Sequence, residues 1–412
     1  MHRKLTGWTD PTSVPSLPLK VTFLDVGDLG PCTCAARRNF VAMQAIGSLE
    51  SATPLPSWYA LGYATTLIVP FWALLAFIYQ GWWAWAVPVH AFLITPLLEL
   101  FWRGKHRSLS GEQEKAALAD PLFDWLLYLI VLVQWSLLIL FLFRLYNWQG
   151  ESWELAGTVA TMGILCGIYG INVAHELGHR RKRWERDLAR ALLLTSLYMH
   201  FIIEHNRGHH TRVATPDDPA SARYGETVYA FWIRSLVFSW ISAWRIEAAR
   251  LRKAGQRPFG ANNEMLQAIC WQAGLLVLIG ILFGTLPLVG FICAAVIGML
   301  LLETVNYIEH YGLRRKLSSN GNYGRVQHVH SWNSDHVLGR LMLFELTRHS
   351  DHHWKASKKY QTLNSLDNGP QLPTGYPGMM LLSLIPPLFF HLVHPQLNEL
   401  AGSEPDLDLA HS

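Results

Sequence analysis

Three clusters of histidine residues give this sequence the means to bind metal. The chain has 412 residues and 19 histidines. Eight of these histidines lie in His175-Glu-Leu-Gly-His179, in Glu204-His205-Asn-Arg-Gly-His209-His210 and in His349-Ser-Asp-His352-His353. A spacing of four residues puts two side chains on one helix face, one turn apart, so His175 and His179 suit one shared ion. Imidazole binds iron, copper, zinc and nickel, and the ligand type alone does not identify the metal.

The first cluster also matches a zinc-protease motif. In the pattern H-E-x-x-H the histidines bind zinc and the glutamate, here Glu176, acts as the base. One zinc ion takes three or four protein ligands, whereas eight imidazoles suit two ions of higher coordination number with open positions. We therefore predict a two-metal centre. An intramembrane zinc protease built on His175, Glu176 and His179 is the distant alternative.

The composition places these clusters in a membrane protein. Half of the chain is hydrophobic and 16% is charged, whereas a soluble domain carries about 25% charged residues. A membrane-spanning helix needs about 20 mostly apolar residues. Such runs occur at about 57–80, 83–102, 122–146, 155–174, 265–284 and 287–307. We expect an all-α, polytopic protein with six transmembrane helices.

Three regions follow from this map: an N-terminal arm over 1–56, an integral-membrane domain with the histidine clusters over 57–375, and an interfacial apolar segment with a tail over 376–412. The last two spans meet at Gly284-Thr-Leu-Pro287, which has turn chemistry. Two weaker apolar runs, 191–203 and 376–393, are too short or too interrupted by proline to cross. They are expected at the bilayer interface or against protein.

The basic residues predict the orientation of the chain. Of the 34 Lys and Arg, all except Arg144 lie in 1–56, 103–121, 175–264 and 308–412, which are alternate loops of the six-span map. Cytoplasmic loops carry the excess of Lys and Arg, so both termini and the histidine clusters are expected on the cytoplasmic side. A metal transporter, with ligands near the bilayer midplane, is disfavoured by the same map.

A ninth histidine ends the sixth span. Glu303, Asn306 and His310 are spaced i, i+3 and i+7, so they share one helix face. An ionisable residue within a span is a functional candidate, either as a ligand or as an acceptor that orients a histidine N–H. A carboxylate paired with another helix is the alternative for Glu303. Further carboxylates near the clusters are candidates for the same supporting role: Glu176, Glu204, Asp217, Asp218, Glu309 and Asp351.

Taken together, the clusters resemble those of the integral-membrane di-iron oxygenases, the superfamily of fatty-acid desaturases and hydrocarbon hydroxylases. Within it, Asn306-Tyr-Ile-Glu-His310-Tyr-Gly-Leu313 is similar to the signature of membrane alkane 1-monooxygenases. The segment Arg348-His-Ser-Asp-His-His353 is similar to their last histidine box. The resemblance extends from about residue 50 to about residue 365. Thr347 and Trp354 depart from the expected Gln and Ala, at positions that are not ligands.

The resemblance implies an enzyme with two non-haem iron ions and O2 as co-substrate. It would convert n-alkanes to 1-alkanols in the bacterial inner membrane, with electrons from a separate rubredoxin that an NADH-dependent reductase reduces. No protein acid or base is assigned beside the di-iron centre, and no nucleic-acid partner is expected. The five cysteines form no CxxC pair, which agrees with a separate rubredoxin. The implied iron ligands are His175, His179, His205, His209, His210, His310, His349, His352 and His353.

Two alternatives remain within the superfamily. One is an aryl-methyl hydroxylase of the xylene type, and the other is an acyl-lipid desaturase. Desaturase first boxes are usually wider than H-x3-H, and the stretch around His310 favours alkanes. An alkane would enter sideways from the bilayer through an apolar channel. Gly163 and Gly167 of the fourth span could line that channel or let two helices pack closely.

Overall fold

The structure is a computed structural model that describes residues 55–56, 59–102, 104, 108–366 and 368–410. Nearly all of the predicted N-terminal arm, 1–56, therefore lies outside the described residues.

Six helical segments of the described chain are long and apolar enough to cross a membrane, which confirms the predicted all-α, six-span architecture. Their bounds are Tyr59–Tyr79, Gly81–Phe101, Leu122–Tyr146 (α7), Ser152–Gly178, Glu264–Phe283 (α14) and Thr285–His310 (α15). The first contains α2 (Tyr59–Gly62) and α3 (Ile68–Tyr79), the second α4 (Ala86–Val89) and α5 (Thr95–Phe101), and the fourth α8 (Ser152–Leu165) and α9 (Ala174–Gly178). The protein is a multi-pass membrane protein.

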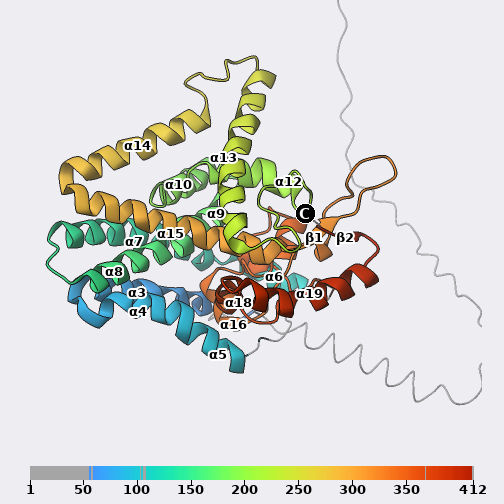
Figure 1. Cartoon of the computed structure of the whole chain (residues 1–412), viewed down its shortest axis with the longest axis horizontal. Helices are drawn as coiled ribbons and strands as arrows, with labels where there is room; N and C mark the ends of the chain where they lie inside the picture. The colour runs from blue at the N-terminus through green and yellow to red at the C-terminus, as the bar shows by residue number, and fades with distance from the viewer. Residues whose placement is uncertain (1–54, 57–58, 103, 105–107, 367, 411–412) are drawn as a thin grey trace, which may run out of the picture. The chain divides into compact units, whose positions relative to one another are not determined.

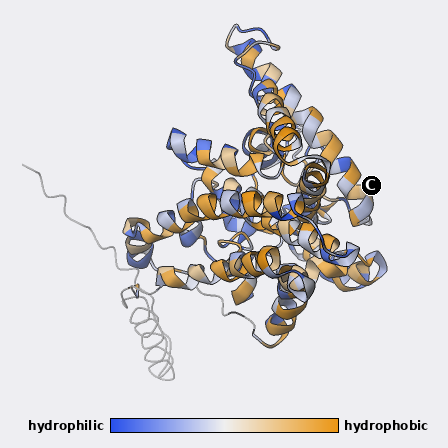
Figure 2. Cartoon of the chain, turned by 90° about the vertical axis from the view of Figure 1, so that its left-hand side faces the viewer, coloured by the Kyte–Doolittle hydropathy of each residue, from blue (hydrophilic) through white to orange (hydrophobic). Residues whose placement is uncertain are grey.

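Lipid-facing side chains explain why these helices are apolar all round. Leu132 on α7 and Ile281 on α14 are 68% and 77% exposed, although both are large and apolar. A helix that is hydrophobic on every face is stable where its outer face meets hydrocarbon. Figure 2 shows hydrophobic residues all along the spanning helices.

Two spans of the bundle approach each other especially closely. α8 and α15 lie side by side in Figure 1. A Cβ atom added to Gly163 would come 2.5 Å from Ile297, and one added to Gly298 would come 2.6 Å from Cys166. Small residues let two backbones approach within a membrane, so Gly163 serves the close packing foreseen for it.

A tight turn joins α14 to α15 as the sequence suggested. Gly284 has a φ of 82° and stands between Phe283, where α14 ends, and Thr285, where α15 begins. This left-handed conformation favours glycine because it has no Cβ.

The remaining elements lie outside the six spans, and the longest of them are α13 and α19. The helices are α6 (Gly111–Ala119), α10 (Arg183–Leu194), α11 (Phe201–Glu204), α12 (His210–Arg212), α13 (Val228–Lys253), α16 (Val337–Met342), α17 (His349–Trp354), α18 (Tyr376–Ser383) and α19 (Pro386–Ser403). The strands β1 (Leu313–Arg315) and β2 (Leu407–Leu409) pair antiparallel, with Arg315 opposite Leu407. The weak apolar run 191–203 is divided between α10 and α11, the run 376–393 is divided between α18 and α19, and neither belongs to a candidate span.

Candidate metal centre

The nine histidines singled out from the sequence meet in two neighbouring groups. Within each group, one ligand nitrogen per residue lies within 4.8 Å of every other. The five-histidine group consists of His175, His179, His205, His210 and His352, and the four-histidine group consists of His209, His310, His349 and His353.

Two pairs of adjacent histidines connect the groups. His209 and His210 are consecutive, yet each contributes its ring to a different group, and the same holds for His352 and His353. The ring centroids of His210 and His352 are 4.8 Å apart on one side, and those of His209 and His353 are 4.8 Å apart on the other. The two dipeptides therefore face each other and hold the two groups side by side.

Local helix geometry positions the first five rings. His175 lies in α9, directly after a π-helical segment, Cys166–Val173, and His179 follows α9. A second π-helical segment, His205–His209, precedes His210. π-Helical turns are frequent at functional sites, and they change which residues share a face. Here His205 shares its group with His210, five positions on, rather than with His209.

The spacing of the nitrogens suits metal ions better than hydrogen bonds. The Nε2 atoms of His179, His205 and His210 lie 3.0–3.2 Å from one another. A neutral imidazole has one N–H, so three Nε2 atoms cannot all hydrogen-bond to one another. Two nitrogens about 2.1 Å from one ion lie about 3.0 Å apart at a right angle and about 3.4 Å apart at a tetrahedral angle.

The other pairs have the same spacing. Nε2 of His352 lies 2.9 Å from Nε2 of His175, and Nε2 of His349 lies 2.8 Å from Nε2 of His353 and 3.1 Å from Nε2 of His310. The donor set is all imidazole, which suits iron, copper, zinc or nickel. The residues therefore fit two transition-metal ions.

Burial keeps most of these rings neutral. Burial, and then the neighbouring imidazoles, lower the pKa of His205, His210 and His352 well below its ordinary value. Burial in the same way lowers the pKa of His179 to about 3. A neutral imidazole is the form that binds metal, so these nitrogens carry free lone pairs at neutral pH.

His209 differs because a carboxylate touches it. Burial, the largest single effect, would lower the pKa of His209, but the charge of Asp218, the hydrogen bond to it and the charges of Glu204 and Glu303 together raise it. Nδ1 of His209 lies 2.9 Å from Oδ2 of Asp218, which also accepts a hydrogen bond from Ser221 at 2.6 Å. Nε2 of His209 is buried without a partner among the described atoms. Donation of the Nδ1 proton to Asp218 leaves the Nε2 lone pair directed at the four-histidine group.

Comparison with known proteins identifies the family. The fatty acid desaturase family model matches residues 151–383. Alkane 1-monooxygenase 1 of Pseudomonas aeruginosa is 37% identical over 353 residues, which cover 84% of this chain and 91% of that protein. The chain belongs to the alkane 1-monooxygenases of the fatty acid desaturase family. It is an oxidoreductase.

Other relatives show how far this similarity extends. Alkane 1-monooxygenase 2 of Alcanivorax borkumensis is 33% identical over 79% of this chain and 86% of its own length. The hydroxylase component of xylene/toluene monooxygenase from Pseudomonas putida is 29% identical over 82% of this chain and 89% of its own length. The resemblance found in the histidine boxes is confirmed at the level of the family.

Among the carboxylates expected to support this monooxygenase centre, Glu309 contacts a histidine. Its Oε1 lies 3.3 Å from Nδ1 of His349 and accepts a hydrogen bond of 2.8 Å from the Tyr376 hydroxyl. Ser331 lies near a second ring, with its Oγ 3.5 Å from Nδ1 of His310. Sequence reasoning did not find Ser331, and it did not distinguish Asp218 from its neighbour Asp217.

Of the other carboxylate candidates, Asp217 is exposed, and the remaining four have polar partners elsewhere. Glu176 pairs with Arg180 at 2.8 Å, and Asp351 pairs with Lys358 at 2.7 Å. Glu204 accepts hydrogen bonds from Arg212 and Ser242. Glu303 accepts a hydrogen bond of 2.8 Å from the Tyr198 hydroxyl and contacts Asn306 at 3.4 Å. Glu303 and Asn306 also line a small cavity with His205 and His209.

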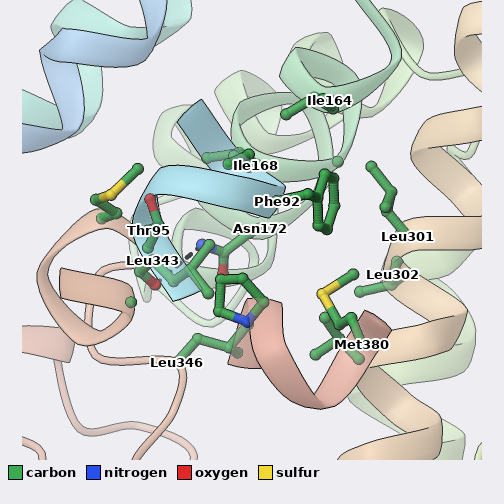
Figure 3. Close-up of a pocket in the computed structure, with 16 residues that line it drawn as sticks. Phe92, Thr95, Ile164, Ile168, Asn172, Leu301, Leu302, Leu343, Leu346 and Met380 are labelled. Carbon is green, nitrogen blue, oxygen red and sulfur yellow. Dashed lines mark hydrogen bonds between the residues drawn. The ribbon is translucent and has the colours of Figure 1, made fainter. Parts of the chain in front are cut away.

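An apolar cavity of about 70 Å³ lies between the spans of this family member. Figure 3 shows Phe92, Ile168, Leu302 and Met380 around it. Thr95 and Asn172 are polar residues of its lining, and Asn172 donates a hydrogen bond of 2.9 Å to the Leu343 carbonyl.

Three chain segments lead from this cavity to the metal centre. The lining residues Asn172, Val305 and Leu346 stand three, five and three residues before His175, His310 and His349. The expected apolar channel from the bilayer stays a prediction, and this cavity is the apolar space nearest in sequence to three of the histidines. Gly167 lines it as well, with a Cβ position only 3.3 Å from Leu301.

Proposed function

We propose that this protein hydroxylates the terminal methyl group of n-alkanes, with O2 as oxidant and two iron ions as cofactors. One oxygen atom enters the 1-alkanol, and the other leaves as water with two electrons and two protons. The observation that carries this proposal is the pair of histidine groups beside an apolar cavity. The names of the relatives point to the same substrate class.

The proposed role of the nine histidines is to hold the two irons with positions left open. An alkane carbon has no charge, dipole or acidic proton for a side chain to act on. Bound iron would supply the activation of O2 that this unreactive C–H bond requires. Asp218 and Glu309 would fix the rings of His209 and His349, because a bound histidine is oriented by the acceptor on its other nitrogen.

The proposed role of the cavity is to hold the alkane by its chain. The lining of Ile168, Leu302 and Met380 offers no polar partner, so binding rests on burial of methylene groups, each contributing about 0.8 kcal/mol. Secondary C–H bonds are weaker than primary ones. Selectivity for the terminal carbon would therefore come from a narrow cavity that presents the chain end first.

Electrons would arrive from a separate rubredoxin at a basic surface. A surface hollow of about 450 Å³ reaches His179 of the five-histidine group. Its lining has six cationic residues against the three acidic residues Glu114, Asp124 and Glu185, and the cations are Arg180, Arg181, Lys182, Lys355, Lys358 and Lys359. Complementary charge would steer a small acidic carrier to this point. The excess of Lys and Arg on this side supports a cytoplasmic location of the centre in the bacterial inner membrane.

The test is metal analysis of the purified protein, followed by reaction with octane, O2 and reduced rubredoxin. About two irons per chain and 1-octanol as the product are expected. p-Xylene and an acyl lipid serve as competing substrates, because one relative is a xylene/toluene monooxygenase component. Preferential oxidation of the aryl methyl group would contradict the alkane assignment. One zinc per chain without an oxygenated product would contradict the oxygenase itself.

A further inference from the structure

A short two-stranded sheet follows the helix that carries His310 of the four-histidine group. β1 begins three residues after His310, the last residue of α15. β2 comes from the far C-terminal part of the described chain and pairs with all three residues of β1. Figure 1 places the two strands together, away from the loop that joins α14 to α15. This pairing could not be predicted from the sequence, because a strand of three residues is too short to show a periodic pattern.

Arg315 of β1 ties this sheet to the segment that carries His209. Its Nε donates to the Val213 carbonyl at 2.6 Å, and one Nη donates to the Thr211 carbonyl at 2.9 Å. The backbone N–H of Arg315 donates to the Ala214 carbonyl at 2.7 Å. Arg315 is 7% exposed, so these bonds form largely away from water, where hydrogen bonds to a charged donor are strong.

The consequence concerns two rings that come from different parts of the chain. His209 and His310 belong to the same group, with ring centroids 4.9 Å apart. One belongs to the segment before Thr211 and the other to the helix before β1, so the bonds of Arg315 connect the two backbone segments. Along the chain, His209 and His310 are about 100 residues apart, so chain connectivity alone does not hold them close together.

β2 supports the same arrangement from the other side. The carbonyl of Asp406, the residue before β2, lies 3.1 Å from Nε2 of His330. Ser331, the residue after His330, contacts His310. Leu407, opposite Arg315, is 4% exposed within an apolar cluster that also contains Tyr311 and Leu397. The strand is thus anchored both by backbone bonds and by burial.

We propose that Arg315 is a positioning residue for the four-histidine metal site, and that β2 holds Arg315 in place. This inference rests on the proposed two-iron centre. Arg315→Met keeps the length of the side chain and removes its donors, while Arg315→Lys keeps the charge and one donor group. Arg314→Met is the matched control, since Arg314 lies on the same strand and donates to the Tyr323 hydroxyl instead. Leu407→Asp should loosen β2, and Asp408→Ala, at an exposed position of the same strand, is its control.

The experiment measures iron per chain and the Mössbauer spectrum of the full-length variants, with thermal unfolding as a check of the fold. Loss of a group that orients ligands typically lowers metal affinity about 10–100-fold. Arg315→Met and Leu407→Asp should therefore fall from two irons to about one and lose the signal of one ion. Arg315→Lys should hold an intermediate amount, and both controls should hold two.

Two results would overturn the inference in distinguishable ways. If Arg315→Met and Leu407→Asp both keep two irons and an unchanged spectrum, the positioning role is wrong while the two-iron centre stands. If the unmodified protein itself holds fewer than two irons, the proposed function fails and this inference fails with it.

Discussion

Asp218 holds His209 by a 2.9 Å contact between Oδ2 and Nδ1, and both side chains are almost completely buried. Although burial would raise the pKa of Asp218, attraction to His209 and the hydrogen bonds from His209 and Ser221 lower it. The carboxylate therefore stays charged at neutral pH. It fixes the tautomer of His209 in which Nε2 is free to bind metal.

Replacement of this carboxylate should weaken the four-histidine site. Asp218→Asn keeps the size of the side chain but removes the charge that favours the Nδ1 proton. We expect metal affinity to fall about 10–100-fold at one of two sites, measured by metal content after dialysis against graded chelator. Asp217→Asn, at the exposed neighbouring position, is the control and should bind two ions. Equal affinities in the two variants would contradict the role of Asp218.

The size of the cavity should set the preferred chain length of the substrate. Phe92 fills part of this space (Figure 3), so Phe92→Ala should admit longer alkanes. Interiors are close-packed, and a ring-sized gap would be refilled by roughly two to four additional carbons of substrate. Competition among C6 to C16 alkanes, followed by product analysis, measures the shift.

The control for this variant removes a phenylalanine elsewhere on a span. Phe71→Ala changes a side chain that is 52% exposed on the first span and does not line the cavity. It should leave the chain-length profile unchanged. An identical shift in both variants would mean that general destabilisation, rather than cavity size, governs selectivity.

The sequence predicted those parts of the site that depend on regular helix geometry. A spacing of four on an α-helix brings His175 and His179 together, and the structure places both in the five-histidine group. Six apolar runs of adequate length became six candidate spans because the bilayer fixes the length of a crossing helix. The observed ends of the spans differ from the predicted ends by only a few residues, mainly where the fourth span continues to Gly178.

The partition of the other histidines was beyond sequence reasoning because it depends on irregular backbone. In an α-helix His205 would share a face with His209, but the π-helical segment His205–His209 groups His205 with His210 instead. No sequence pattern separates Asp218 from Asp217. Their difference is burial, which tertiary packing alone decides.

The basic hollow around His179 should control electron delivery. Lys182→Glu and Lys355→Glu reverse two exposed charges of this hollow. Electrostatic steering changes association rates by about 10-fold or more, so KM for rubredoxin should rise at low salt while kcat changes little. Salt screens exposed charges, and the difference from the unmodified protein should shrink as ionic strength increases.

A charge reversal far from the hollow provides the control for this prediction. Lys253 ends α13, is exposed and does not line the hollow. Lys253→Glu makes the same change in net charge and should leave KM for rubredoxin unchanged. A rise of KM in Lys253→Glu equal to that in Lys182→Glu would argue for a diffuse effect of net charge rather than a docking surface.

The two metal ions should leave the protein at different rates. All four residues of the His209 group are buried, whereas His179 and His210 of the other group are partly exposed, and the surface hollow reaches His179. A soluble chelator should therefore remove one ion per chain before the second. Metal content and the Mössbauer spectrum, followed over time in chelator, measure the two phases. Loss of both ions in a single phase would show that the groups open together, and that access through the hollow does not determine the rate.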